Sequence, residues 1–577
     1  MKKHFVLIIM LLTSLFVYAE DDDYLSLFGD SGSSEESSSS AGSSDSGSSF
    51  GGYDFTAIPD FKLSLYGDHK AEFRMPVLPD YFDFDSYIKA PKFRNEVGIE
   101  VNYKSLKLVS GFKFDILLRE SEISAEPPNQ WQDILNVMPM ENYISWSPWK
   151  IKFSAGLQTF SWGTADGMNP TDNINPVDFR FGADSEKIPI LAAAFSMYPA
   201  DCFSFDLVYV PFEQENYFPV DFRDYVPGLL FASGIDYDTL NGSYTATNKK
   251  GEKFNEDNPI GSDQFRFGKL NFDPSTLLAG AKFNFRVPHV DFSFSYLYDY
   301  DNYYTPEITV QEAPISFNGA TPMFKFVTLD ELNLIRRRVH RFGADVKGAV
   351  DRFGMWAELC FNMTDDYLME SYKIRNHSLN FTTGFDFNYG PDDSFYMNFQ
   401  IVGQVNFDYD YNFYKDYPFY SMFDTNDMNN IELSMTDMMP YMTTFASKSD
   451  MEKFYYRALV NRLSASSEWC ELGLAFQMNW PVLDNLLKPS LTASYLVPIG
   501  YDTDYVHRYG CLFVKPEFDI QPFDSFHITI GADLYFSWRK LKDKEVEMYQ
   551  YDKFGMLHKN SSVYVCVKYK WGMDWTK

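Results

Sequence analysis

Long runs of alternating apolar and polar side chains constrain this sequence more than any other feature. In one run, aromatic residues at Phe292, Phe294, Tyr296, Tyr298 and Tyr300 are separated mostly by polar residues. A period of two places alternate side chains on opposite faces of a β-strand. Several runs reach the roughly 9 to 11 residues of a membrane-crossing strand and exceed the about 5 or 6 of a usual soluble strand. We therefore expect strands with one aromatic face and one polar face.

Such segments recur from Phe61 to the end of the chain, for example at 395–409 and 563–571. We count about 18, and because bacterial barrels have even strand numbers, we predict 16 or 18. The expected fold class is all-β: a single transmembrane antiparallel β-barrel of about 16–18 strands, formed by residues 61–577, with long extracellular loops. The strand-poor stretches 212–278, 305–334 and 411–456 are the predicted loops. A soluble sandwich or propeller is the alternative, but its strands are usually shorter.

The N-terminus indicates export. Lys2 and Lys3 precede an apolar run over residues 5–17, and Ala19 supplies a small residue before an acidic stretch. This pattern predicts a secretory signal peptide over residues 1–19. Residues 20–60 are acidic and rich in Ser and Gly, which predicts a flexible N-terminal tail. No later apolar run approaches the roughly 20 residues that a membrane-spanning helix needs, whereas a closed barrel crosses with strands.

Composition fits a barrel whose two faces differ. The 577 residues include 55 Phe, 40 Tyr and 10 Trp, yet the mean hydropathy is -0.30. A lipid-facing surface with aromatic girdles and a polar lumen would account for both values. The net charge of -30 disfavours nucleic-acid binding, which needs a basic surface. The five cysteines form neither a disulfide framework nor a zinc motif, so we expect no metal and no cofactor.

The most distinctive local sequence follows Gln158. It runs through Trp162-Gly163 and Asp166 to two Asn-Pro-x-Asp motifs at 169–172 and 175–178. Over about residues 150–211 it resembles a group of porin-like bacterial outer-membrane proteins, in which Gln-x-x-x-Trp-Gly leads into a loop with Asn-Pro and Asp. The resemblance implies the fold and the location and says little about the substrate. The candidate loop residues are Trp162, Asp166, Asn169, Asp172, Asn175 and Asp178.

Two interpretations of these loop residues stay open. A residue before proline avoids the α region, and Asn and Asp side chains bond to nearby backbone, so both motifs favour turns. Alternatively, Asp166, Asp172 and Asp178 gather around Ca²⁺ as oxygen ligands. Turns are the preferred interpretation, because the sequence lacks EF-hand spacing.

An arginine cluster is the second candidate site. Alternation points Arg336, Arg338 and His340 to one face of a strand and Arg337 and Arg341 to the other. Because charge on the lipid face is costly away from the interfaces, we expect this cluster at a rim or partly inside the lumen. One hypothesis is that Arg336, Arg338 and His340 face acidic lumen residues and select solutes. The other is an interfacial arginine girdle.

The predicted function is a porin or channel for passive or weakly selective passage of small solutes. An enzyme is not indicated, since Gly-x-Ser-x-Gly is absent and the neighbours His377 and Ser378 point to opposite faces of a strand. The alternatives are a surface adhesin or antigen that acts through its loops, and a transporter of a hydrophobic substrate. Expected partners are outer-membrane lipid, the barrel-assembly machinery, a small solute and possible further copies of the chain.

Overall fold

The computed structural model describes the strands and parts of the connections. The described residues are 61–77, 92–117, 135–165, 169–178, 186–212, 246–247, 253–254, 278–312, 316–318, 321–323, 327–350, 352–390, 394–408, 456, 460, 469–483, 485–499, 506–507, 510–538, 540–541 and 561–576. The predicted signal peptide and tail, and most of 212–278 and 411–456, lie outside them. Within the described residues, no helix is both long and apolar enough to cross a membrane.

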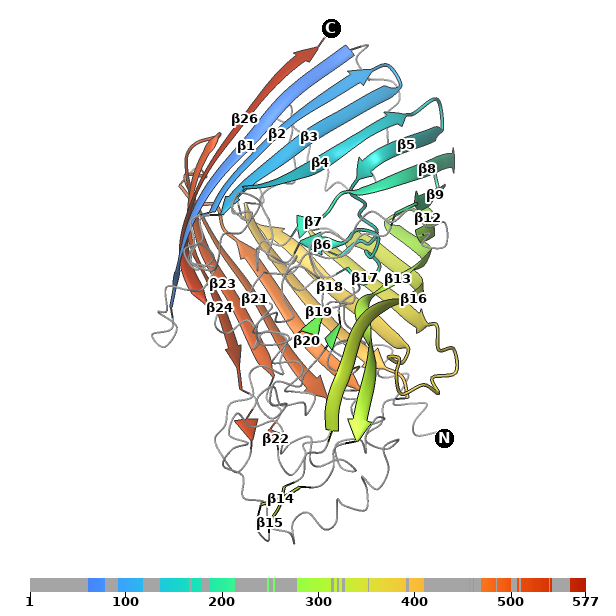
Figure 1. The fold of residues 1–577 in the computed structure, drawn as a ribbon. Helices are drawn as coiled ribbons and strands as arrows, with labels where there is room; N and C mark the ends of the chain where they lie inside the picture. The colour runs from blue at the N-terminus through green and yellow to red at the C-terminus, as the bar shows by residue number, and fades with distance from the viewer. Residues whose placement is uncertain are drawn as a thin grey trace.

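Eighteen strands form one antiparallel sheet, and each pairs with the next strand of the ring. The last strand pairs with the first, from Lys62↔Thr576 to Pro76↔Ser562, so the sheet closes into a barrel without free edges (Figure 1). This confirms the predicted fold class and the higher predicted strand number. The barrel strands are β1 (Phe61–Pro76), β2 (Lys92–Tyr103), β3 (Leu106–Leu117), β4 (Leu135–Trp146), β5 (Ile151–Gln158), β8 (Ile190–Ala200), β9 (Phe203–Val210), β12 (Leu278–Val287), β13 (Val290–Glu312), β16 (Val327–Val350), β17 (Phe353–Thr364), β18 (Ser378–Tyr389), β19 (Phe395–Asn406), β20 (Cys470–Asn479), β21 (Leu487–Ile499), β23 (Cys511–Phe523), β24 (Phe526–Ser537) and β26 (Ser562–Thr576).

Short two-stranded pairs belong to the connections. They are β6 (Val177–Asp178) with β7 (Glu186–Lys187), β10 (Ala246–Thr247) with β11 (Lys253–Phe254), β14 (Ser316–Asn318) with β15 (Thr321–Met323), and β22 (Val506–His507) with β25 (Lys540–Leu541).

The two ends of the barrel differ in their connections. At the turn end, β2 meets β3 and β12 meets β13 through two residues each, and Lys104 and His289 adopt the positive φ of tight turns. At the loop end, the connections from β5 to β8 and from β9 to β12 are far longer. The loop predicted over 305–334 is wrong in part, because β13 and β16 continue into it as a paired hairpin. The segment 307–312 itself alternates, with Ile and Val between polar residues, and so supports a strand.

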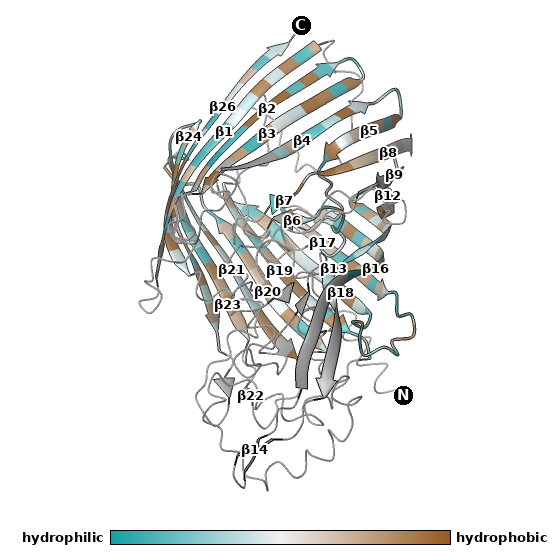
Figure 2. Cartoon of the chain, in the orientation of Figure 1, coloured by the Kyte–Doolittle hydropathy of each residue, from teal (hydrophilic) through white to brown (hydrophobic). Residues whose placement is uncertain are grey.

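Strand alternation sorts the side chains as predicted. On β13, Phe294 is 54% exposed on the outer face, whereas Ser293 and Asp299 are buried on the inner face. Figure 2 shows the same alternation of hydrophobic and hydrophilic bands along most strands. Residues paired across neighbouring strands share a face, so the outer face carries the apolar side chains and the inner face most of the charged ones.

Candidate functional site

The connection from β5 to β8, residues 159–189, enters the barrel. Its ends are adjacent, since Gln158 and Ile190 are partners in the sheet. A two-residue turn could have joined them, yet some thirty residues intervene and place β6 and β7 between the barrel walls (Figure 1). We call residues 159–189 the inward segment; its described parts are 159–165, 169–178 and 186–189.

The two Asn-Pro motifs shape this segment through backbone contacts. The N–H of Asp172 donates to the carbonyl of Asn169 at 3.0 Å, which closes a turn over the first motif. Asn175 accepts the N–H of Phe160 at 2.7 Å and donates to the carbonyl of Ile188 at 2.9 Å. The geometry therefore supports the turn interpretation at the first motif, whereas the second motif leads into β6, and Asn175 joins the two ends of the segment.

The segment is packed against the inner wall by Trp162. The ring is 6% exposed and lies in an apolar cluster with Ile174 of the same segment. Gly280 on β12 makes room, because a Cβ there would lie 2.9 Å from the ring of Trp162 and 2.9 Å from Leu297. The wall side of the cluster is formed by Ile190, Ala192, Val208, Val210, Leu278 and Leu297. Trp162 and Ile174 therefore fill the apolar inner face of β8, β9, β12 and β13.

A second attachment reaches β17. The carboxylate of Glu358 is buried and accepts the backbone N–H groups of Thr164 and Ala165, the latter at 2.6 Å. The hydroxyl of Thr171 donates to the other oxygen at 3.0 Å. Thr171 also lies over Gly343, where a Cβ would come within 2.9 Å of its methyl group. A charged acceptor with several donors holds this part of the segment on β16 and β17.

A third attachment reaches β2 and β3. Glu186 forms ion pairs with Arg94 of β2 and Lys113 of β3. Burial alone would raise the pKa of Glu186, but the neighbouring charges of Arg94 and Lys113 outweigh it and lower the pKa to about 2. Within the segment, Lys187 forms an ion pair with Asp172, which also accepts the N–H of Trp162 at 3.1 Å.

These attachments lie on opposite sides of the barrel. Strand β17 is nine places from β2 in the ring of eighteen strands, which is half of the circumference. The strands between them are β3, β4, β5, β8, β9, β12, β13 and β16. Because Glu186 binds β2 and β3 while Thr164, Ala165 and Thr171 bind β17, the inward segment crosses the lumen. Charged groups of both signs line that crossing.

The candidate loop residues divide into three groups. Trp162, Asp172 and Asn175 are buried and hold the segment together. Asn169 begins the first turn. Asp166 lies outside the described residues, and of Asp178 only the backbone pairing with Glu186 is described. The calcium interpretation gains nothing, since the carboxylate of Asp172 is engaged by Lys187 and by the N–H of Trp162.

The arginine cluster splits between the two faces, as alternation predicted. His340 packs against Tyr296 and Tyr298 of the outer face, and Arg338 lies 3.8 Å over the ring of Tyr300. Arg336 lies 5.8 Å over the same ring. These contacts correct the hypothesis of a lumenal filter at Arg336, Arg338 and His340 and favour the interfacial girdle, because cation and aromatic groups meet there on the outer surface.

Arg337 and Arg341 lie on the inward-facing side of β16, as alternation predicted, and Arg337 forms an ion pair with Asp365 at 3.1 Å. Arg341 is 2% exposed, and the inward position four residues on is Asp345. Asp345 forms an ion pair with Lys282 of β12 at 3.3 Å and accepts a hydrogen bond from Ser293. Sequence analysis missed Arg94, Lys113 and Glu358; their inward positions followed from alternation, but their contacts with the inward segment did not.

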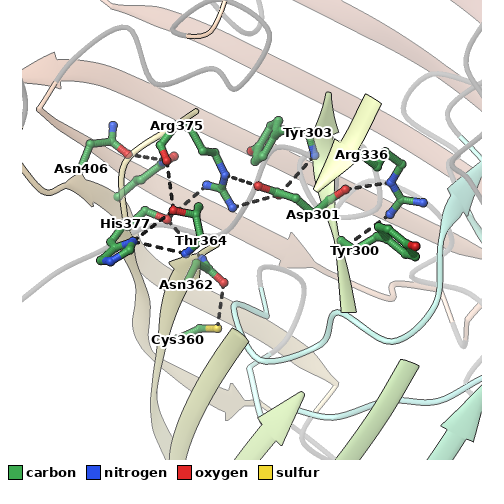
Figure 3. A network of polar contacts seen from close by, with 12 residues as sticks. Tyr300, Asp301, Tyr303, Arg336, Cys360, Asn362, Thr364, Arg375, His377 and Asn406 are labelled. Carbon is green, nitrogen blue, oxygen red and sulfur yellow. Dashed lines mark hydrogen bonds and ion pairs between the residues drawn. The ribbon is translucent and has the colours of Figure 1, made fainter. Parts of the chain in front are cut away.

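A polar network joins neighbouring strands and connections at the loop end beside this wall (Figure 3). Arg375 binds both carboxylate oxygens of Asp301, at 2.5 and 2.9 Å, and lies 4.8 Å under the ring of Tyr303. The Nε–H of Arg336 donates to the carbonyl of Asp301 at 2.8 Å. His377 accepts the N–H of Thr364 at 3.2 Å. The connection from β17 to β18 is thereby fixed to the hairpin of β13 and β16.

No family model and no curated protein matches the sequence. Solved structures do align over 89% of this chain. Pseudomonas aeruginosa OccK1 (OpdK) is covered to 99% with 7% identity and a TM-score of 0.43. Pseudomonas aeruginosa OccK5 (OpdH) is covered to 99% with 8% identity and a TM-score of 0.41, and OpdK with vanillate to 99% with 7% and 0.41. The barrel assignment rests on the strand pairing of this chain itself.

Proposed function

We propose that this protein is an outer-membrane channel for small solutes, with the inward segment as its constriction. The outer face fits a bilayer. From His340 at the loop end to Val350 at the turn end, β16 advances ten residues. At about 3.3 Å per residue and a tilt near 40°, this is roughly 25 Å of membrane thickness.

Aromatic side chains border this belt at both ends. Tyr298 and Trp538 lie toward the loop end. Trp146, Trp149 and Trp480 are exposed at the turn end. Two girdles around an apolar band are the signature of a membrane barrel, so these residues support insertion in a bilayer.

The single observation that carries the channel proposal is the lumen crossing. A segment tied to β2 and β3 through Glu186 and to β17 through Glu358 narrows the lumen between these walls. Because charges of both signs surround it, solutes meet a transverse field there, which favours small polar or charged solutes. The apolar inner face near Trp162 is already filled, so it does not favour a hydrophobic substrate.

The test is single-channel conductance of the mature protein in a planar bilayer, with heat-modifiable gel mobility as the control for a folded barrel. Discrete conductance steps whose size changes in the variant Glu186→Gln support the channel. A folded barrel that never conducts contradicts it and leaves the adhesin alternative.

A further inference from the structure

The outer face of β1 to β4 differs from the rest of the belt. On the described strands from β5 to β24, outward positions between the girdles carry no hydroxyl, amide or charged group apart from tyrosines and Thr383. On β1 to β4, four consecutive strands each place one polar side chain there, and we call them the outer polar patch: His69, Asn95, Ser110 and Asn142.

Each of these residues is flanked by apolar outward neighbours. Ser110 lies between Leu108 and Phe112, which are 46% and 49% exposed. Val97, beside Asn95 on the same face, is 43% exposed. The patch therefore lies within the apolar belt and not at a membrane interface. Hydrocarbon cannot form hydrogen bonds, so a polar group that lacks a partner within the barrel at this depth marks a contact with another protein surface.

The patch contains a directional hydrogen-bond chain. The Nε1–H of Trp571 donates to Nε2 of His69 at 3.1 Å, so the proton of a neutral His69 is on Nδ1, and this atom lies 2.9 Å from Oδ1 of Asn95. The chain ends on the Nδ2 group of Asn95, for which the described residues offer no acceptor. Ser110 donates to Oδ1 of Asn142 at 2.7 Å, and Nδ2 of Asn142 donates to the carbonyls of Met140 and Gly111. Asn142 is therefore satisfied within the barrel, and the oxygen of Ser110 is left as an acceptor.

We propose that the outer polar patch is the contact between copies of this chain in a closed homo-oligomer. A carboxamide both donates and accepts, so Asn95 of one copy is complementary to Asn95 of another. Lipid tails offer no such partner. Ala71 is a small outward residue beside His69 and leaves room for a second barrel, whereas the ring of Trp571 fills the space over Gly67.

Two variants of matched polarity test this interface. Asn95→Leu removes the terminal donor, and Thr383→Val makes the same kind of change on β18, far from the patch. We expect the wild type and Thr383→Val to have an oligomer mass by native mass spectrometry in mild detergent, and Asn95→Leu to shift to the mass of one chain. We expect the conductance per barrel to be unchanged in Asn95→Leu, because the variant affects the contact between copies and not the channel. The two proposals can therefore fail independently. A monomeric wild type, or an oligomer that Asn95→Leu leaves intact, overturns the interface.

Cross-linking keeps the test independent of variant stability. In a Cys202→Ser background, which removes the exposed cysteine, Val97→Cys places a thiol beside Asn95 and leaves the carboxamide in place, and Thr383→Cys places a thiol outside the patch. A thiol cross-linker applied to membranes should join two copies through position 97 and none through 383. Cross-links through 383 alone, or through 97 to another protein, contradict the proposal.

Discussion

The carboxylate of Glu358 on β17 accepts the backbone N–H of Ala165 at 2.6 Å, although 193 residues separate the two in the chain. Glu358 stands on the far wall from β2, so this bond fixes how far the inward segment reaches across the lumen. Charge-assisted bonds of this kind contribute about 1.5–3 kcal/mol each.

Replacing Glu358 should loosen the constriction. Glu358→Ala removes the acceptor for Thr164, Ala165 and Thr171. We expect larger and noisier single-channel steps, since the inward segment loses its attachment to β17. Glu358→Gln keeps a carbonyl acceptor in the same place and should lie between the wild type and Glu358→Ala. Identical traces for all three proteins would show that this contact does not set the pore size.

Filling the space at Gly280 should displace Trp162. A valine there would overlap the Trp162 ring and Leu297, and overpacking of this kind costs about 1–3 kcal/mol. We expect Gly280→Val to lower the temperature at which the barrel unfolds on gels and to alter conductance. Gly572→Ala is the matched control, because its nearest atom would lie 3.8 Å away. Equal behaviour of the two variants would argue against a close fit at Trp162.

Removing the charge of Glu186 should shift ion selectivity toward anions. Glu186→Gln leaves Arg94 and Lys113 without the carboxylate that pairs with both. A change of about 1 kcal/mol in the electrostatic barrier corresponds to a roughly fivefold change in the permeability ratio. Glu100→Gln, which removes a carboxylate paired with Lys107 toward the turn end, serves as the control. Reversal potentials under a salt gradient measure both.

The same site predicts a pH dependence. Because the folded pKa of Glu186 is lowered to about 2, its pairing is complete above the usual carboxylate pKa of 4.5 and is lost only as the pH falls through about 2. We expect the contribution of Glu186 to selectivity to be constant from pH 7 to 5. In the double variant Arg94→Gln and Lys113→Gln, the pKa of Glu186 rises, so Glu186 loses its charge at a higher pH than in the wild type. A wild-type transition near pH 6 that vanishes in Glu186→Gln would contradict this assignment.

The two faces of the arginine cluster should respond differently. Arg341→Gln removes a lumenal positive charge and should shift selectivity toward cations. Arg338→Gln acts on the outer face, where the guanidinium lies over Tyr300, and should leave the reversal potential unchanged. Heat-modifiable mobility controls for folding in both variants. If Arg338→Gln shifted the reversal potential as much as Arg341→Gln, this would contradict the placement of Arg338 on the outer face.

Local patterns predicted the strands well and the site poorly. The alternation from Phe292 to Tyr300 determines the faces of β13 by itself, because a strand has a period of two. The same rule separated Arg338 from Arg341, but which of them faces the lumen depends on the neighbouring strands. Glu358 and Glu186 could not be linked to the inward segment from sequence, since their partners are distant along the chain and are brought together only when the barrel closes.

The most direct test of the account is the conductance of a barrel that lacks the constriction. Since Gln158 and Ile190 are paired in the sheet, residues 160–187 can be replaced by a short Gly-Ser linker that keeps β5 beside β8. The account predicts a folded, heat-modifiable barrel with single-channel steps several times larger than those of the wild type and weaker ion selectivity. Steps of unchanged size and selectivity would contradict the claim that this segment forms the constriction.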